Sequence, residues 1–185
     1  MPFFKSHPDN ATPGIVFTSH PEIYKLWSRM SEALMNGPSP LSPGEREMIA
    51  AFTVGVAGCD FAYIAHSEAA YAWGIERGLL DDLIRDIDAA KIDAKLKPLL
   101  RYVRKLTLAP GEMTQEDADA VFAAGWDEKA LHDAIAICAR MCFMQRIVEG
   151  HGFIPMSREH ARENAAKRVK LGYVNLYPQF RDAKD

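Results

Sequence analysis

Cysteine is scarce in this chain of 185 residues, which has three: Cys59, Cys138 and Cys142. An odd and sparse set of cysteines is not a disulfide framework. Because disulfides persist in oxidising compartments and are rare in reducing ones, we expect the protein to be cytoplasmic. The first residues agree with this expectation, since Met1–Ser6 lack the hydrophobic region of a signal peptide.

Long apolar runs and an excess of positive charge are also missing. No window approaches the roughly 18 uninterrupted apolar residues of a transmembrane helix, so no membrane span is expected. The chain has 22 Lys and Arg against 25 Asp and Glu, a net charge of -3, and therefore no basic footprint for nucleic acid. Its composition, 48% hydrophobic and 25% charged, is that of an ordinary globular protein, and its length predicts one domain over residues 1–185.

The alternating apolar pattern of β-strands is absent too, and the periodicity that is present is helical. The predicted fold class is therefore all-α. The expected helices span residues 19–36, 43–57, 59–77, 81–90, 93–107, 114–125, 127–150 and 157–171. In the first of them, one apolar stripe is formed by Ile23, Leu26, Trp27, Met30 and Leu34.

Capping residues mark several of the expected helix starts. Ser42 and Glu45 have the spacing of a capping box, with Pro43 at the first helical position. Two further pairs have this spacing: Ser19 with Glu22, and Thr114 with Asp117. Single N-cap residues are expected at Asp93, Asp127 and Ser157.

The two ends of the chain are expected to differ from the helical body. Residues 1–18 hold three prolines and are predicted to form an irregular N-terminal arm that lies on the rest of the protein. Residues 157–185 are predicted to be a charged, solvated helix that includes Arg168, followed by a tail. The tail holds Tyr173, Tyr177 and Phe180, so we expect it to pack on the body or on a neighbouring subunit.

The stretch most suggestive of chemistry lies around Gly58, which separates two expected helices. Cys59, Ala62, Tyr63 and His66 follow at positions i, i+3, i+4 and i+7, so helical spacing places them on one face. A thiol in the first turn of a helix feels the positive end of the helix dipole, which lowers its pKa. A histidine two turns on can exchange a proton with that thiol when both face one pocket.

Glu47, Cys59, Ala62 and His66 also have the spacing of a known motif. The chain resembles the alkylhydroperoxidase AhpD-like branch of the carboxymuconolactone decarboxylase superfamily. There, a glutamate is followed twelve positions on by Cys-x-x-Cys, and the second cysteine is followed four positions on by a histidine. Residues 41–50 resemble the peroxidase-related subgroup. The resemblance implies an AhpD-like helical bundle, a small-molecule substrate, no cofactor and a homo-oligomer built from trimers.

The resemblance also implies a reaction. In the family the second cysteine is thought to attack a peroxide with help from the histidine. The first cysteine then closes a disulfide that an outside thiol system reduces. This chain has Ala62 at the place of the second cysteine and Phe61 where a further histidine is often found. The intramolecular disulfide cycle therefore cannot run here as it does in the family.

A single reactive thiol is the first hypothesis for the residues that remain. Cys59 as a thiolate would reduce a hydroperoxide and become a sulfenic acid, while His66 handles the proton and Glu47 orients the histidine. An external thiol reductant would complete the cycle, or else Cys138 or Cys142 if its Cα lay within about 7 Å of that of Cys59. The expected pocket residues are Phe61, Ala62 and Tyr63.

Three alternatives use the same residues. In an acid–base enzyme, as in the decarboxylase branch, His66 and Glu47 would transfer protons and Cys59 would be a bystander. A non-catalytic member would keep a pocket without turnover, with these side chains as core residues. A three-ligand zinc or iron site has no close pair of ligands to support it, so no metal is expected. For Cys138 and Cys142 the simpler interpretation is that both are small buried core residues.

Overall fold

The computed structural model describes residues 1–177 of the chain, and all its regular elements are helices. In chain order they are α1 (Pro13–Ser19), α2 (Pro21–Asn36), α3 (Pro43–Val56), α4 (Asp60–Ala72), α5 (Leu79–Arg85), α6 (Leu96–Leu108), the 3₁₀ helix η1 (Pro110–Glu112), α7 (Gln115–Ala123), α8 (Glu128–His151) and α9 (Arg158–Leu171). No strand occurs within the described residues, so the all-α prediction is confirmed for this part of the chain. None of these helices combines the length and the apolar character that crossing a membrane requires.

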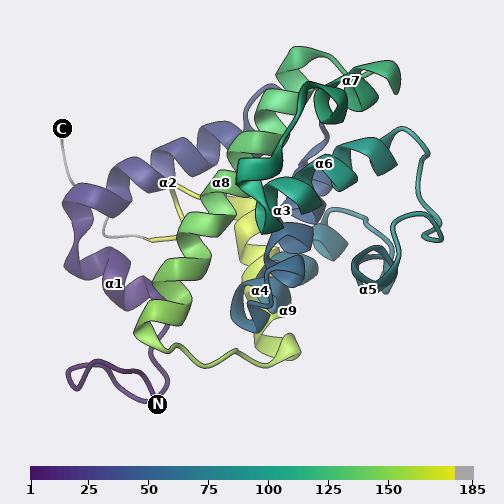
Figure 1. Cartoon of the computed structure of the whole chain (residues 1–185). Helices are drawn as coiled ribbons and strands as arrows, with labels where there is room; N and C mark the ends of the chain where they lie inside the picture. Colours follow the sequence, from purple (N-terminus) through teal and green to yellow (C-terminus); the bar gives the residue numbers. More distant parts are fainter. Residues whose placement is uncertain (178–185) are drawn as a thin grey trace.

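Helix α3 runs through the middle of the fold, with α4 beside it and the long α8 packed against it (Figure 1). Helices α5 and α6 also contact α3, and α9 lies along α4. Residues 46–54 are all buried. A helix that is apolar all round is a core helix, and this segment departs from that pattern at Arg46, Glu47 and Thr53. Glu47 is therefore held in the interior, where a carboxylate needs partners.

The predicted caps are confirmed at the starts of α3, α7, α8 and α9. At α3, the Ser42 hydroxyl accepts from the Glu45 N–H at 3.2 Å, and the Glu45 carboxylate accepts from the Ser42 N–H at 2.7 Å. A second capping box starts α7. Asp127 and Ser157 each accept a hydrogen bond from a backbone N–H in the first turn of α8 and α9. These helix starts depend on local sequence alone, which is why spacing predicts them.

The prediction of an irregular arm over residues 1–18 is wrong for its last part, because Pro13–Ser19 form helix α1. The capping box predicted for Ser19 with Glu22 does not form either. The Ser19 hydroxyl instead donates to the Ile15 carbonyl at 2.8 Å, inside α1. The side chain that was expected to start one helix is therefore bonded within the last turn of another.

Helices α4 and α5 end earlier than predicted. Helix α4 ends at Ala72, and Gly74 follows with φ at 95°, in the left-handed region that favours glycine. Helix α5 ends at Arg85, because the Asp86 side chain accepts from the Asp88 N–H at 2.8 Å and turns the chain. In both places a local turn competes successfully with continuation of the helix.

The apolar stripe predicted on α2 lies largely on the surface of the chain. Ile23, Leu26 and Met30 are 52%, 64% and 48% exposed. The buried residues of α2 are Tyr24, Ser28, Ser31 and Met35. This buried face is partly polar because it meets a buried guanidinium: Arg140 of α8 donates to the Ser31 hydroxyl at 3.0 Å.

Helix α9 and the segment after it close the fold over α4. Ala161 and Ala165 of α9 are buried, and Tyr173 is only 4% exposed. The ring of Tyr177 meets the ring of Phe17 edge-on, with 5.2 Å between centroids. The described part of the tail therefore packs on the body of its own chain, while Phe180 lies outside the described residues.

We predict that Ser42→Ala lowers the free energy of unfolding by about 1 kcal/mol, because α3 loses its capping box. Ser42→Asp is the matched control and keeps most of that stability, since aspartate is an equally good N-cap. Urea unfolding of the three proteins measures the difference. Equal losses in both variants would show that the cap does not stabilise α3.

Candidate active site

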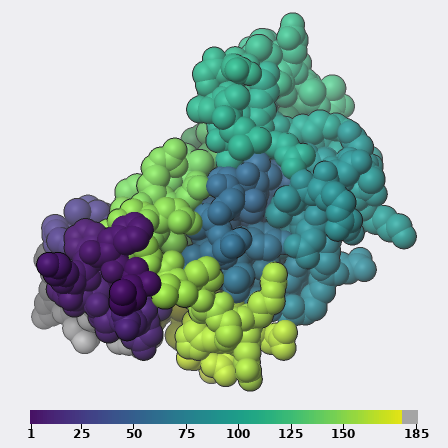
Figure 2. Space-filling model, turned by 60° about the horizontal axis from the view of Figure 1, so that its bottom comes forward, coloured from purple at the N-terminus to yellow at the C-terminus, as the bar shows by residue number. Residues whose placement is uncertain are grey.

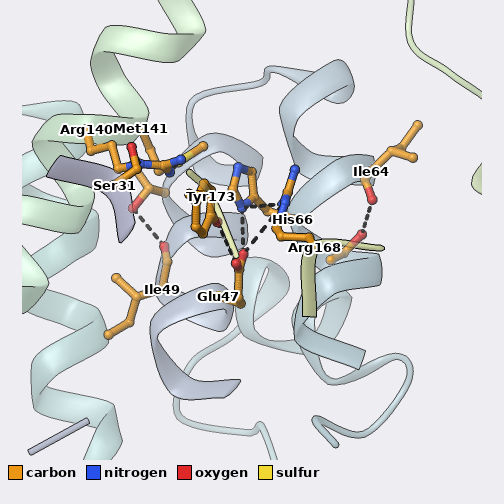
Figure 3. A network of polar contacts seen from close by, with 11 residues as sticks. Ser31, Glu47, Ile49, Ile64, His66, Arg140, Met141, Arg168 and Tyr173 are labelled. Carbon is orange, nitrogen blue, oxygen red and sulfur yellow. Dashed lines mark hydrogen bonds and ion pairs between the residues drawn. The ribbon is translucent and has the colours of Figure 1, made fainter. Parts of the chain in front are cut away.

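A buried acid–imidazole pair joins α3 to α4. The Nδ1 atom of His66 lies 2.7 Å from Oε2 of Glu47, and the two residues are 6% and 2% exposed. Figure 3 shows the Glu47 carboxylate at the centre of a polar network that also includes Tyr173 and Arg168. Glu47 and His66, two of the residues with the motif spacing, are therefore in direct contact.

The remaining partners of Glu47 come from the C-terminal part of the chain. The Tyr173 hydroxyl donates to Oε1 of Glu47 at 2.5 Å. Arg168 of α9 places its Nη1 3.9 Å from Oε2 of Glu47 and 3.4 Å from Nδ1 of His66. The Glu47 carboxylate thus contacts an imidazole, a phenol and a guanidinium. Together these groups stabilise its negative charge in the interior.

Sequence reasoning missed the roles of Arg168 and Tyr173. Arg168 was assigned to a solvated helix, but its side chain is only 18% exposed. The available signal is helical spacing: Arg168 follows the buried residues Ala161 and Ala165 by seven and three positions, so it shares their face. An arginine that continues a face of small residues is a candidate for the interior.

The partners of the pair decide its protonation. Burial alone would raise the pKa of Glu47, but His66, Arg168 and Tyr173 outweigh it and lower that pKa to about 2. Burial lowers the pKa of His66 to about 4, opposed by Glu47 and assisted by the charges of Arg168 and Arg140. Near neutral pH the pair is therefore a carboxylate and a neutral imidazole, with the imidazole proton on Nδ1 toward Glu47.

A cavity of about 410 Å³ adjoins His66, and its walls come from α1, α2, α4, α8, α9 and the segment after α9. Since Nδ1 faces Glu47, Nε2 is the ring nitrogen that a molecule in this cavity can reach. Phe61 and Ala62 also line the cavity, as expected for pocket residues. Figure 2 shows the face where the N-terminal segment and α9 lie on either side of the end of α8, and all three border the cavity.

Cys59 is not among the residues that line this cavity, and it is 1% exposed. Burial raises the pKa of its thiol to about 12, and the Glu149 carboxylate adds to the rise. The prediction of a lowered thiol pKa is therefore wrong. The helix dipole is worth about 1 kcal/mol or less at an ordinary site, and removal of the thiolate from water costs more than that.

The geometry also separates Cys59 from the face that helical spacing assigned to it. Cys59 is the N-cap of α4, with φ -95° and ψ 90°, so its backbone is extended and the helix starts at Asp60. A residue with extended backbone does not follow the helical direction of its neighbours. Tyr63 does not line the cavity either, and its hydroxyl donates to the Asp81 carboxylate.

The other candidate ligands and thiols lie apart from the pair. Cys138 is buried on α8, with its sulfur 3.4 Å from the Thr107 hydroxyl, while Cys142 is half-buried. Contact with Cys138 and the charge of Arg146 lower the pKa of the Cys142 thiol. Within residues 1–177 no three His, Cys, Asp or Glu side chains gather as a metal site, so the alternative of Glu47, Cys59 and His66 as metal ligands is not formed.

We predict that iodoacetamide alkylates Cys142 first in the native protein and Cys59 much later. Cys142 is half-buried and its pKa is lowered, whereas Cys59 is sealed and its pKa is raised to about 12. Peptide mass spectrometry after timed quenching gives the order, with the unfolded protein as the control for equal intrinsic reactivity. Cys59 reacting first would contradict the geometry of the thiol.

We predict that His66 titrates with a pKa of about 4. An ordinary histidine titrates near about 6.5, so the unfolded chain takes up its proton first and the free energy of unfolding decreases as the pH falls between these values. Imidazole NMR signals followed against pH measure the midpoint, and His66→Asn identifies the resonance. A midpoint at the ordinary value would mean that the imidazole is not buried as described.

Comparison with known proteins supports the fold. Residues 21–105 match the model of the carboxymuconolactone decarboxylase family. A comparison with curated proteins finds no significant match. An uncharacterized peroxidase-related protein from Silicibacter sp. TM1040 has a similar structure, with a TM-score of 0.73 and 23% identity over 80% of this chain and 77% of that one.

A second solved structure, described as an alkylhydroperoxidase AhpD core and uncharacterized peroxidase-related protein from Ralstonia eutropha JMP134, has a TM-score of 0.72. It is 22% identical over 80% of this chain and 78% of that one. The two TM-scores show a shared fold, and the segment that the family model matches contains Glu47 and His66. Residues 21–105 of this chain are therefore similar to the carboxymuconolactone decarboxylase family, and its helical fold is similar to that of the two peroxidase-related structures, one of them described as an AhpD core.

Proposed function

We propose that this protein is an enzyme that works by general acid–base chemistry, with His66 as the group that moves the proton. The observation that carries the proposal is the 2.7 Å contact of His66 Nδ1 with Glu47 beside a cavity that His66 lines. A base oriented by a buried carboxylate is a recurring arrangement in enzymes. The substrate is a small molecule that fits the cavity.

The proton path follows from the tautomer. With Nδ1–H donated to Glu47, Nε2 accepts a proton from a carbon or oxygen acid in the cavity, and the imidazolium that forms faces the carboxylate. Tyr173 and Arg168 keep Glu47 anionic, so the positive charge is stabilised at the moment it appears. The same imidazolium can then return its proton to another atom of the substrate.

A peroxidase reaction at Cys59 with an external thiol reductant has weaker support. The solved structures that resemble this chain are described as peroxidase-related, which favours that reaction. The sulfur, however, lies outside the cavity lining and its thiol is held protonated. A thiolate is the form that attacks a peroxide, so the geometry favours the acid–base pair.

The expected homo-oligomer stays a prediction. The exposed residues Ile23, Leu26 and Met30 of α2 are the apolar surface that subunit packing would bury. The cytoplasmic location is likewise an expectation from cysteine usage.

The test compares His66→Asn with Cys59→Ala on two substrate panels. The first holds lactone carboxylates and β-keto acids, assayed by NMR for turnover and for deuterium exchange. The second holds organic hydroperoxides with dithiothreitol. We predict turnover of a first-panel compound that falls by about 10²–10⁴-fold in His66→Asn, the range of general acid–base effects, and stays unchanged in Cys59→Ala.

His160→Asn is the matched control, because His160 lines the same cavity but does not contact Glu47. It should keep most of the activity. If the protein consumed hydroperoxide and this activity disappeared in Cys59→Ala, the result would contradict the proposal and support the reaction at the Cys59 thiol. A protein that turns over neither panel yet binds its members would indicate a non-catalytic binding protein.

A further inference from the structure

The buried polar network has more positive charge than negative. Arg140 of α8 is 4% exposed and, within the described part of the chain, no carboxylate forms an ion pair with it. Its Nε donates to the Ser31 hydroxyl at 3.0 Å, and its Nη1 lies 3.0 Å from the Met141 sulfur. Glu47, the one buried carboxylate of the network, is occupied by His66, Tyr173 and Arg168. Among residues 1–177 this guanidinium is thus held out of water with no carboxylate in direct contact, which is costly.

The uncompensated charge faces the cavity. Arg140, Lys167 and Arg168 all line it, and no Asp or Glu among residues 1–177 does. The guanidinium of Arg140 lies over the ring of Trp27 at 4.6 Å and over the ring of Tyr173 at 4.7 Å. Arg168 lies over the same Tyr173 ring at 5.3 Å. The two arginines are therefore held at one place by shared aromatic contacts.

Two buried hydrogen-bond donors in the cavity wall have no hydrogen-bond partner among residues 1–177. They are Nε of Arg168 and Nε1 of Trp27. A buried donor without an acceptor costs about 1–3 kcal/mol, so such groups are retained where a ligand satisfies them. Both belong to residues already grouped around Tyr173 or Arg140. Donors and positive charge converge at one end of the cavity.

The rest of the lining is mostly apolar. It includes Phe17, Phe61, Met141, Met144 and Val148. Methionine side chains adapt to irregular apolar shapes, and a volume of about 410 Å³ is in the range of small-molecule sites. A ligand that satisfies this cavity has one acidic group and an apolar body.

We propose that Arg140, Arg168 and Trp27 form an anion subsite that binds the carboxylate of a small amphipathic acid. This inference deepens the proposed function, because it names the substrate class of the same site. The carboxylate offsets the buried guanidinium of Arg140 and accepts from Arg168 Nε and Trp27 Nε1, beside His66, and the apolar body lies along the Phe61 and Met144 wall.

Occupation of the subsite also acts on the base. Arg168 and Arg140 both lower the pKa of His66. A bound carboxylate offsets these charges, so the imidazole becomes a stronger base only when the acid is present. Substrate binding and proton transfer are thereby coupled through charge.

The test measures binding, so it does not depend on turnover. Benzoate, 3-phenylpropionate and 4-phenylbutyrate are titrated into the full chain by calorimetry, each against its own primary amide. We predict that at least one acid binds at least about tenfold more tightly than its amide. Arg140→Met and Arg168→Met should each weaken binding of that acid by about tenfold or more and leave binding of the amide unchanged.

Arg162→Met is the matched control, because Arg162 lies on α9 but contacts Glu68 and does not line the cavity. It should bind like the unmodified chain. Thermal unfolding shows whether each variant is folded. The Arg140→Met substitution removes no ion pair formed within the described residues, so this variant should stay folded. In addition, NMR titration should show the pKa of His66 rising when the acid saturates the site.

Three results would overturn the subsite: amides that bind as tightly as acids, arginine variants that keep the acid preference, or no acid binding at about 10 mM. His66→Asn separates this inference from the proposed function. It should keep acid binding and lose turnover. Turnover without acid preference would refute the subsite alone, and acid preference without His66-dependent turnover would refute the acid–base reaction alone.

Discussion

The arrangement of the site depends on the buried carboxylate of Glu47. An ionised carboxylate inside a protein is stable only when its oxygens are occupied by donors and opposite charge. Here the donors come from three parts of the fold: His66 on α4, Arg168 on α9 and Tyr173 beyond α9. Packing of the C-terminal segment and protonation of Glu47 are therefore linked, because loss of any one partner leaves the buried charge with less compensation.

The same constraint arranges the chemistry. Glu47 fixes the imidazole proton of His66 on Nδ1 and leaves Nε2 to the cavity. Arg168, which contacts the carboxylate, and Arg140, which does not pair with it, both lower the pKa of His66 and so weaken the imidazole as a base. A ligand of opposite charge removes that opposition, so binding energy is converted into basicity. Arg140 and Arg168 on one side, and Glu47 and His66 on the other, then act together in binding and proton transfer.

Sequence reasoning reaches what local rules control. Ser42 and Glu45 determine the start of α3, and the spacing of Glu47 and His66 brings the two together once α3 and α4 pack. The prediction for Cys59 is wrong for two reasons. Its backbone is extended, so helical spacing does not apply to it, and burial raises the pKa of its thiol by more than the helix dipole lowers it. Arg168 and Tyr173 were missed for another reason. Spacing places Arg168 on the face of Ala161 and Ala165, but it does not say which part of the fold that face contacts, and Tyr173 lies beyond the helix.

The tautomer of His66 tests the central claim most directly. Nitrogen-15 NMR of the imidazole near neutral pH distinguishes a protonated Nδ1 from a protonated Nε2 and from an imidazolium. The account predicts a proton on Nδ1, strongly hydrogen-bonded to Glu47, and a bare Nε2 toward the cavity. A proton on Nε2, or a doubly protonated ring, would contradict it.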